Sequence, residues 1–255
     1  MASAVPQQNE EIPDLTYKVA PADSDERVEA LKLVADSVAQ QRQAASRAVI
    51  LHPATLSGAI VLFAIMARIL DTTTLFTTTA GMLMAGMLAV RWYTAGYIQL
   101  AEQIGFKWLE EYSKNNHKGH YRSNSNSSGS GSGHSNGNGG SPTNRDPIVL
   151  IAKWGDEIIG ALVLRVVKRE RKGYVRAWTV KLKYRTKGVG RGLLEEGAKV
   201  VWGRGGRGMI FEDNHANAGR VLPDFFNAQF EKREVRAREV LAEVVAETRR
   251  ERSSR

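Results

Sequence analysis

The sequence contains no cysteine, and this absence excludes several kinds of chemistry. Disulfide bonds, thiolate metal ligands and a covalent acyl-cysteine intermediate all require a thiol. Aromatic residues make up only 7% of the 255 residues, although the net charge is +9. Nucleic-acid-binding surfaces commonly interleave stacking aromatics with basic residues, so we expect no nucleic acid partner. The positive charge still allows an anionic lipid or an anionic cofactor.

The N-terminus lacks the features of a signal peptide. Acidic residues precede the first basic residue, Lys18, and no apolar run follows early in the chain. We therefore expect residues 1–12 to form a disordered acidic tail. The missing cysteines fit a reducing, intracellular location without proving it.

Two long runs in the first half of the chain lack charge. Residues 48–67 contain no acid or base except His52, and residues 72–90 contain none. A helix of about 20 residues spans roughly 30 Å, which matches the hydrocarbon core of a bilayer. Only four residues separate the two runs, so we expect residues 47–93 to form a tight transmembrane helical hairpin.

Charged residues beside these runs predict how the hairpin is oriented. Arg42 and Arg47 precede it and Arg91 follows it, whereas Arg68 and Asp71 lie at its tip. Because cytoplasmic flanks carry an excess of Lys and Arg, we expect both ends on the cytosolic side. The aromatic residues expected at the membrane interface are Trp92, Tyr93 and Tyr97.

A hairpin buried inside a soluble core is the alternative interpretation. The threonines of the second run allow it, as do His52 and Pro53 in the first. Small residues such as Gly81 and Gly86 favour close helix packing in either setting. The sequence leaves both interpretations open.

The next two segments differ sharply in composition. In residues 94–122, apolar residues recur at intervals of three and four, which predicts an amphipathic helix. Residues 123–145 are mostly Ser, Asn and Gly, which predicts a flexible linker. The histidines near this linker have no cysteine or carboxylate among them, so we expect no metal site.

The sequence becomes β-rich after the linker. Residues 148–168 hold two β-branched runs broken by Gly155 and Asp156, which is typical of a hairpin. A third run, over residues 174–185, leads into the segment KYRTKGVGRGLLEEGAKVV. Its glycines permit close backbone approach, and the predicted helix start offers free N–H groups. We therefore expect the turn to bind an anion, most often a phosphate.

The order of hairpin, strand, R-x-x-G-x-G turn, helix and strand resembles the GCN5-related N-acetyltransferase (GNAT) family. Val180, Arg185, Gly188 and Gly190 match the family segment V-x-P-x-x-R-x-x-G-x-G, with Leu182 in place of the proline. The resemblance implies an α+β fold with a mixed, mainly antiparallel sheet flanked by helices. The hydrophobic hairpin interrupts this fold between its first two helices.

The resemblance also implies a domain organisation and a location. It assigns residues 13–46 to the first strand and helix and residues 146–231 to the catalytic core, whose last helix would cover residues 217–230. The arrangement is similar to the membrane-anchored acetyltransferases of the endoplasmic reticulum. We therefore expect a membrane location, in the endoplasmic reticulum or another internal membrane, with the catalytic domain facing the cytosol.

The activity implied by the resemblance is acetyl transfer from acetyl-CoA to an amine, carried by a protein or a small molecule. Without cysteine, direct attack of the amine on the thioester is the simpler route. In this family the pantetheine arm of the cofactor pairs with the fourth strand, so residues 178–182 would form the cofactor edge. An N–H near Val180 or Lys181 would polarise the thioester carbonyl. The residues that the resemblance implies for acetyl-CoA binding are Val180, Leu182, Arg185, Lys187, Gly188, Val189, Gly190, Arg191, Gly192 and Asn217.

Proton transfer requires a base and an acid. Glu212 and His215 follow the fifth predicted strand, and we expect one of them to act directly or through water. The residues between them, Asp213 and Asn214, offer the alternative of a simple helix cap. The family often places a tyrosine acid on its last helix, where this chain has Phe225 or Phe226. The acid is therefore unassigned, and an inactive member of the family stays an alternative.

Residues 232–255 depart from the family pattern. Charges of both signs surround apolar residues on one helical face, which predicts a charged C-terminal helix. The helix could lie on the surface or form a homodimer. The alternative function is a catalytically inactive membrane protein of GNAT fold that binds CoA or anionic lipid.

Overall fold

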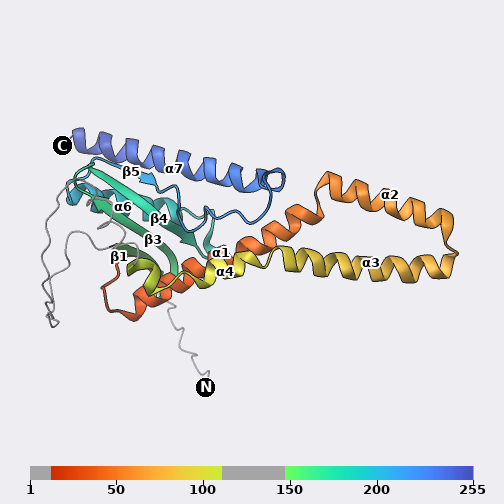
Figure 1. The fold of residues 1–255 in the computed structure, drawn as a ribbon. Helices are drawn as coiled ribbons and strands as arrows, with labels where there is room; N and C mark the ends of the chain where they lie inside the picture. Colours follow the sequence, from red (N-terminus) through yellow and green to blue (C-terminus); the bar gives the residue numbers. More distant parts are fainter. Residues whose placement is uncertain (1–12, 111–146, 255) are drawn as a thin grey trace, which may run out of the picture.

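The computed structural model describes residues 13–110 and 147–254. Within them, five strands form one sheet in the order β1-β2-β3-β4-β5 (Figure 1). The pairs from β1 to β4 are antiparallel, and β5 runs parallel to β4. This mixed, mainly antiparallel sheet with flanking helices confirms the expected α+β fold class. The strands are β1 (Leu15–Val19), β2 (Ile148–Trp154), β3 (Glu157–Val167), β4 (Lys172–Val180) and β5 (Gly208–Phe211).

Helices cover both faces of the sheet because the strand side chains alternate between the faces. α1 (Asp25–Ile50) packs on one face, where Val34 joins the apolar core. α6 (Val189–Gly203) and α7 (Ala228–Ser253) pack on the other face, where Leu193 of α6 is fully buried. The sheet is thus enclosed by two apolar cores that together fix the ends of β4 and β5.

The turn between β2 and β3 forms where the sequence predicted it. Gly155 has φ +60°, a left-handed conformation that glycine adopts without steric cost. The β-branched runs before and after it pair in register, with Ile151 opposite Ala161. The predicted β-hairpin is therefore confirmed.

The two apolar runs form α2 (Pro53–Ile69) and α3 (Thr72–Tyr93), which project away from the sheet as a hairpin (Figure 1). Neither helix contains a buried residue. Within the described residues, one nearly continuous helical stretch is long and apolar enough to cross a membrane. It covers Thr72–Glu102 and so includes α3 and the short helix that follows it. α1 and α2 are long and apolar enough to cross a membrane only when they are taken as one span, with a bend of 50° between them. The alternative of a hairpin buried in the chain's own core is wrong.

A small apolar cluster joins the base of this hairpin to the rest of the fold. It is centred on Tyr97 in α4 (Gly96–Glu102), which is fully buried and stacks on Phe230 of α7. Tyr97 was expected at the membrane interface, and that expectation is wrong because the ring fills this cluster instead. Trp92 and Tyr93 remain exposed at the end of α3.

Several element boundaries differ from the expected ones. The predicted amphipathic helix is interrupted after Glu102 and becomes helical again at residues 106–110, with Gly105 in the break. The expected last core helix is absent, because residues 212–223 form turns and a short 3₁₀ helix covers Asp224–Phe226. α7 instead starts at Ala228 and includes the predicted C-terminal helix. The predicted tail, the linker and residues 111–122 lie outside the described residues.

Candidate functional site: a glycine turn beside the open end of strand 4

β4 and β5 pair along only part of β4. Their register ends at Val175 opposite Phe211, and the last contacts come from the chain after β5. There Glu212 N–H donates to Val175 C=O at 2.9 Å and Ala216 N–H donates to Arg176 C=O at 2.7 Å. Among the described residues, the end of β4 therefore pairs with β3 alone and presents an open backbone edge.

Strand geometry determines which backbone groups face this open edge. Lys181 N–H donates to Ile159 C=O on the β3 side at 2.8 Å. Backbone groups of successive strand residues point to opposite sides, so the N–H of Val180 faces the open side. The carbonyl of Val180 accepts a hydrogen bond from Arg185 Nε at 2.8 Å. The open edge thus offers a free N–H beside the carbonyl that holds Arg185.

The glycine turn lies directly after β4. Thr186 and Gly188 both have left-handed backbone conformations, with φ of 64° and 82°. Gly188 is the N-cap of α6, and its carbonyl accepts from Gly192 N–H at 3.0 Å. The N–H groups in the first turn of α6 have no partner within the helix, so they are directed outward with a partial positive charge. This geometry forms a cradle for an anion such as a diphosphate.

The other two glycines of the turn serve close packing. A Cβ at Gly190 would lie 2.9 Å from the Trp178 ring, whose Nε1 donates to the Gly190 carbonyl at 3.0 Å. A Cβ at Gly192 would overlap the hydroxyl group of Tyr17. No atom within 4 Å opposes a Cβ at Gly188. Backbone conformation therefore requires Gly188, whereas neighbouring rings require Gly190 and Gly192.

The three basic residues expected to assist anion binding have different surroundings. Arg185 is fixed at the end of β4, and its pKa is lowered first by burial and then by the nearby charge of Arg233. Lys187 is exposed, with its Nζ 5.8 Å from the centre of the Tyr184 ring. Arg185 and Lys187 have no ion pair among the described residues, so their charges are available to an anion. Arg191 is paired with acidic side chains from α6 and α7, namely Glu195, Glu243 and Glu247.

The other residues expected at the cofactor site fall into two groups. Val180 and Val189 are buried on either side of the turn, and Leu182 is exposed in the 3₁₀ helix Leu182–Tyr184. Asn217 is directed toward α1, where its Oδ1 accepts from Gln41 Nε2 at 2.9 Å. The structure thus brings the residues of the turn together and leaves Asn217 as a contact between the chain after β5 and α1.

Glu212 directly follows β5, and its N–H donates to Val175 C=O, where the pairing between β4 and β5 ends. Its Oε1 accepts from Arg165 at 3.2 Å in a mostly buried ion pair. The other carboxylate oxygen, Oε2, is buried and has no hydrogen-bond partner among the described residues. A buried carboxylate oxygen without a partner is unfavourable, and it can accept a proton from a substrate or a water molecule.

His215 lies three residues after Glu212 and is largely buried. Its Nδ1 accepts from Asn217 N–H at 3.2 Å, so the ring proton resides on Nε2, 3.7 Å from Glu234 Oε1. Burial lowers the pKa of His215, and the opposing charge of Glu234 only partly offsets this effect. The ring is therefore neutral near pH 7, and its proton-accepting nitrogen is engaged by the backbone.

The two phenylalanines at the position of the family's tyrosine lie outside the site. Phe225 and Phe226 contact the ring of His52, with centroid distances of 5.7 and 4.9 Å. His52 is the N-cap of α2, so these rings belong to the base of the hairpin.

The resemblance included Trp178 in the cofactor edge of the fourth strand, but the sequence interpretation missed its contact with α6. Trp178 lies across the start of α6, and its ring centroid is 6.0 Å from that of Phe211 in β5. The sequence interpretation also missed Arg233. Arg233 approaches Arg185 from α7, and no local sequence signal predicts that contact.

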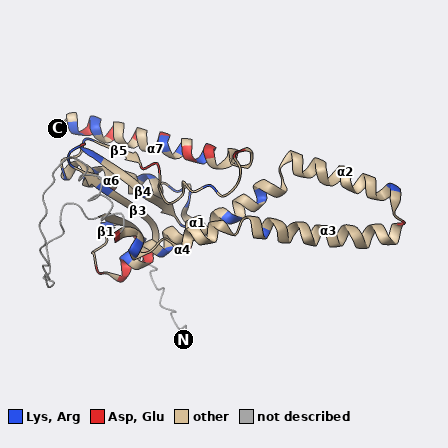
Figure 2. Ribbon diagram, in the orientation of Figure 1, with Lys and Arg blue, Asp and Glu red and all other residues tan. Residues whose placement is uncertain are grey.

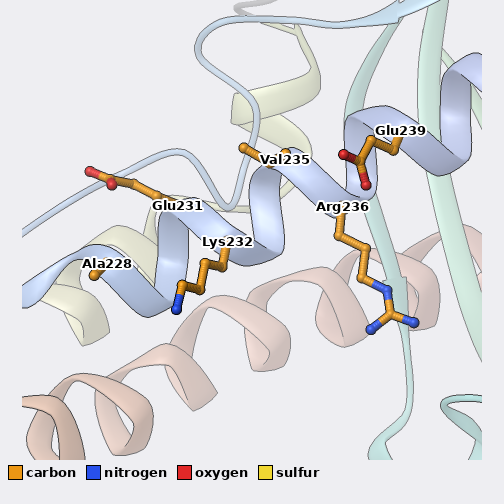
Figure 3. Close-up of a pocket in the computed structure, with 6 residues that line it drawn as sticks. All are labelled: Ala228, Glu231, Lys232, Val235, Arg236 and Glu239. Carbon is orange, nitrogen blue, oxygen red and sulfur yellow. The ribbon is translucent and has the colours of Figure 1, made fainter.

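The cavity of about 480 Å³ drawn in Figure 3 lies apart from this site. All of its lining residues are exposed positions of α7, offset from the buried Phe230 and Leu241 of the same helix. The described residues contain no group of three histidine or acidic side chains placed to hold a metal ion. The residues that line the cavity are Ala228, Glu231, Lys232, Val235, Arg236 and Glu239.

Comparison with known proteins assigns a class to this region. Residues 133–220 match the acetyltransferase (GNAT) family, so this segment is similar to a GNAT acetyltransferase domain. The match includes β2 to β5, the glycine turn, Glu212 and His215. It supports acyl transfer in general, and GNAT domains generally use acetyl-CoA.

Similar solved structures include an aminoglycoside acetyltransferase from an uncultured soil metagenomic sample in complex with sisomicin. It is 13% identical, with a TM-score of 0.26, over 35% of this chain and 55% of that one. The same enzyme in complex with trehalose is 18% identical, with a TM-score of 0.26, over 34% and 55% of the two chains. The chain thus covers about half the length of these structures. No curated protein matches the chain.

Proposed function

We propose that the protein is a membrane-anchored N-acetyltransferase that moves acetyl from acetyl-CoA to an amine. The observation that carries this proposal is the left-handed turn at Thr186 and Gly188, which opens α6 beside the unpaired end of β4. The free N–H groups of α6 suit the cofactor diphosphate. The edge of β4 suits an extended amide chain such as pantetheine, which can pair with it as an added strand.

The chemistry proceeds by direct attack. The amine nitrogen forms a bond to the thioester carbon, and the carbon–sulfur bond then breaks to release the CoA thiolate. Val180 N–H stabilises the oxyanion that develops on the carbonyl. The amine loses one proton to a base, and the thiolate gains one from an acid. A covalent acyl-cysteine is excluded because the chain has no cysteine.

Glu212 is the better candidate for the base. Its Oε2 is buried and has no hydrogen-bond partner among the described residues, whereas Nδ1 of His215 is engaged by Asn217 N–H. We assign Glu212 as the base, acting directly or through water, and His215 as the group that orders the chain after β5. The acid is water or a group from the acceptor.

The hairpin of α2 and α3 is the proposed anchor. Its 17 and 22 residues correspond to lengths of roughly 25 and 33 Å, close to the thickness of a hydrocarbon core. Threonine hydroxyls in α3 donate within the helix, as Thr78 Oγ1 does to Thr74 C=O at 2.7 Å. Asp71 caps α3 at the tip through Thr74 N–H. The exposed faces therefore present few unsatisfied polar groups to lipid.

The charge distribution supports a cytosolic catalytic domain. Figure 2 shows basic positions at the base of the hairpin and both basic and acidic positions at its tip, where Arg68 and Asp71 lie. By the excess of positive charge in cytoplasmic flanks, both ends of the hairpin would face the cytosol. We propose the endoplasmic reticulum or another internal membrane as the location.

A second candidate function is a membrane protein of this fold that binds CoA or anionic lipid without catalysis. Two observations favour it. The phenylalanines at the position of the family's tyrosine lie at the base of the hairpin, and Glu212 is held by Arg165. Both candidates bind an anion at the turn, so turnover distinguishes them.

An acetyl-transfer assay tests the proposal. Detergent-solubilised protein is given acetyl-CoA and a panel of peptide amines, polyamines and small amines, and the acetylated product is measured by mass. We expect one amine class to be acetylated and Glu212→Gln to reduce kcat by about 100-fold or more, as expected for loss of a general base. Binding of acetyl-CoA without any product would favour the second candidate.

A further inference from the structure

An exposed apolar belt surrounds the base of the hairpin. Leu51, at the bend between α1 and α2, is 64% exposed, and Trp92, near the end of α3, is 81% exposed. The third member, Phe225, is 62% exposed and comes from the chain after β5. Exposed large apolar side chains gathered from separate segments commonly mark an interaction surface.

Contacts with the hairpin base fix Phe225 in this position. The ring of His52, at the N-cap of α2, meets the Phe225 and Phe226 rings edge-on. Val221 packs against Gly96 at the start of α4, where a Cβ would lie 3.0 Å from Val221 Cγ1. The segment from Val221 to Phe226 thus packs against the helices at the base of the hairpin.

Arginine side chains surround the same base. Arg42 on α1 donates to the Arg91 carbonyl on α3 at 3.2 Å, and Arg47 follows on α1. These three arginines have no ion pair among the described residues, and Asp224 is the one acid between Val221 and Phe226. Figure 2 shows the basic positions where the hairpin meets the body. An anionic surface complements the positive charge of these three arginines.

We propose that the segment Val221–Phe226 lies in the headgroup layer of an anionic bilayer, with Phe225 inserted at the boundary with the acyl chains. Aromatic side chains favour that depth, and the three arginines contact lipid phosphates around it. This inference rests on the proposed membrane insertion of the hairpin. In this arrangement, the chain that follows Glu212 and His215 lies at the membrane surface.

The missing cysteines make a direct test of depth feasible, because one introduced cysteine is the only labelling site. Phe225→Cys is labelled with an environment-sensitive fluorophore, and the protein is reconstituted into phosphatidylcholine–phosphatidylserine vesicles with brominated acyl chains. Asp224→Cys is a second label in the same segment. Ile60→Cys in α2 reports insertion of the hairpin, and Lys199→Cys on α6 is the water-exposed control.

We expect bromines near the headgroups to quench the labels at positions 224 and 225 more than bromines deep in the chains do. Deep bromines should quench the label at position 60, and neither should quench the label at position 199. Quenching at position 60 with none at 224 and 225 would overturn this inference and leave the anchor intact. No quenching at position 60 would overturn the anchor as well. Equal quenching at position 225 in pure phosphatidylcholine would contradict the role of the arginines.

Discussion

At the scale of single residues, different physical constraints require glycine at the different positions of the turn. Gly188 is required by its left-handed φ, whereas Gly190 is required by the ring of Trp178. The sequence placed both in one phosphate-binding motif, because a motif records residue types and not the contacts behind them. The structure has a turn where the sequence predicted one, and the reason for Gly190 became visible only from the position of the Trp178 ring.

Gly190→Ala should destabilise the fold by about 1–3 kcal/mol, because the new methyl group overlaps the Trp178 ring. Chemical denaturation measures the change in the free energy of unfolding. Gly203→Ala is the matched control in the same helix, since no atom lies within 4 Å of its Cβ position. Equal stability of both variants would show that Trp178 moves away without cost.

His215 should make stability depend on pH. Its folded-state pKa is lowered, mainly by burial, so the unfolded chain binds the proton more readily. The free energy of unfolding should therefore fall as pH decreases below about 6.5, the ordinary value for histidine. Denaturation curves between pH 5 and 8 measure this slope, and His215→Gln should flatten it. An unchanged slope in the variant would contradict the burial of this ring.

At the scale of elements, the strands and the glycine turn followed from local patterns, but the chain after β5 did not. Alternation of β-branched residues and the turn at Gly155 depend on near neighbours, so the sequence predicted them. The segment at residues 217–230 was expected to be helical by resemblance. In the structure, Asn217 contacts α1 and Phe226 contacts the hairpin base. Such long-range contacts leave no local pattern.

α7 is held on α6 by an apolar seam and by Arg191. Leu241 is buried in the seam, so Leu241→Ala should cost about 2–5 kcal/mol in the free energy of unfolding. The Arg191 side chain is 40% exposed, so Arg191→Ala should cost much less than Leu241→Ala, and added salt should reduce that cost. Thermal or chemical denaturation compares the two. A larger effect for Arg191 would mean that its ion pairs, and not the seam, hold α7.

At the scale of the whole molecule, an exposed apolar hairpin projects from the sheet that carries the candidate site (Figure 1). Ile60 and Leu83 are exposed on the two hairpin helices, so Ile60→Arg with Leu83→Arg should leave the fold of the sheet intact. Each arginine should disfavour insertion by about 2.5–3.5 kcal/mol. Fractionation of membranes under alkaline conditions measures the shift to the soluble fraction, with Ile60→Leu as the control. Retention of the double arginine variant in membranes would contradict the anchor.

The glycine turn is the proposed cofactor site, and calorimetric titration of the detergent-solubilised protein with acetyl-CoA tests this role most directly. We expect micromolar binding, abolished by Gly188→Glu because the new carboxylate repels the diphosphate. Gly203→Glu, at the opposite end of α6, should bind normally. Absence of binding in the folded protein, or unchanged affinity in Gly188→Glu, would contradict the account.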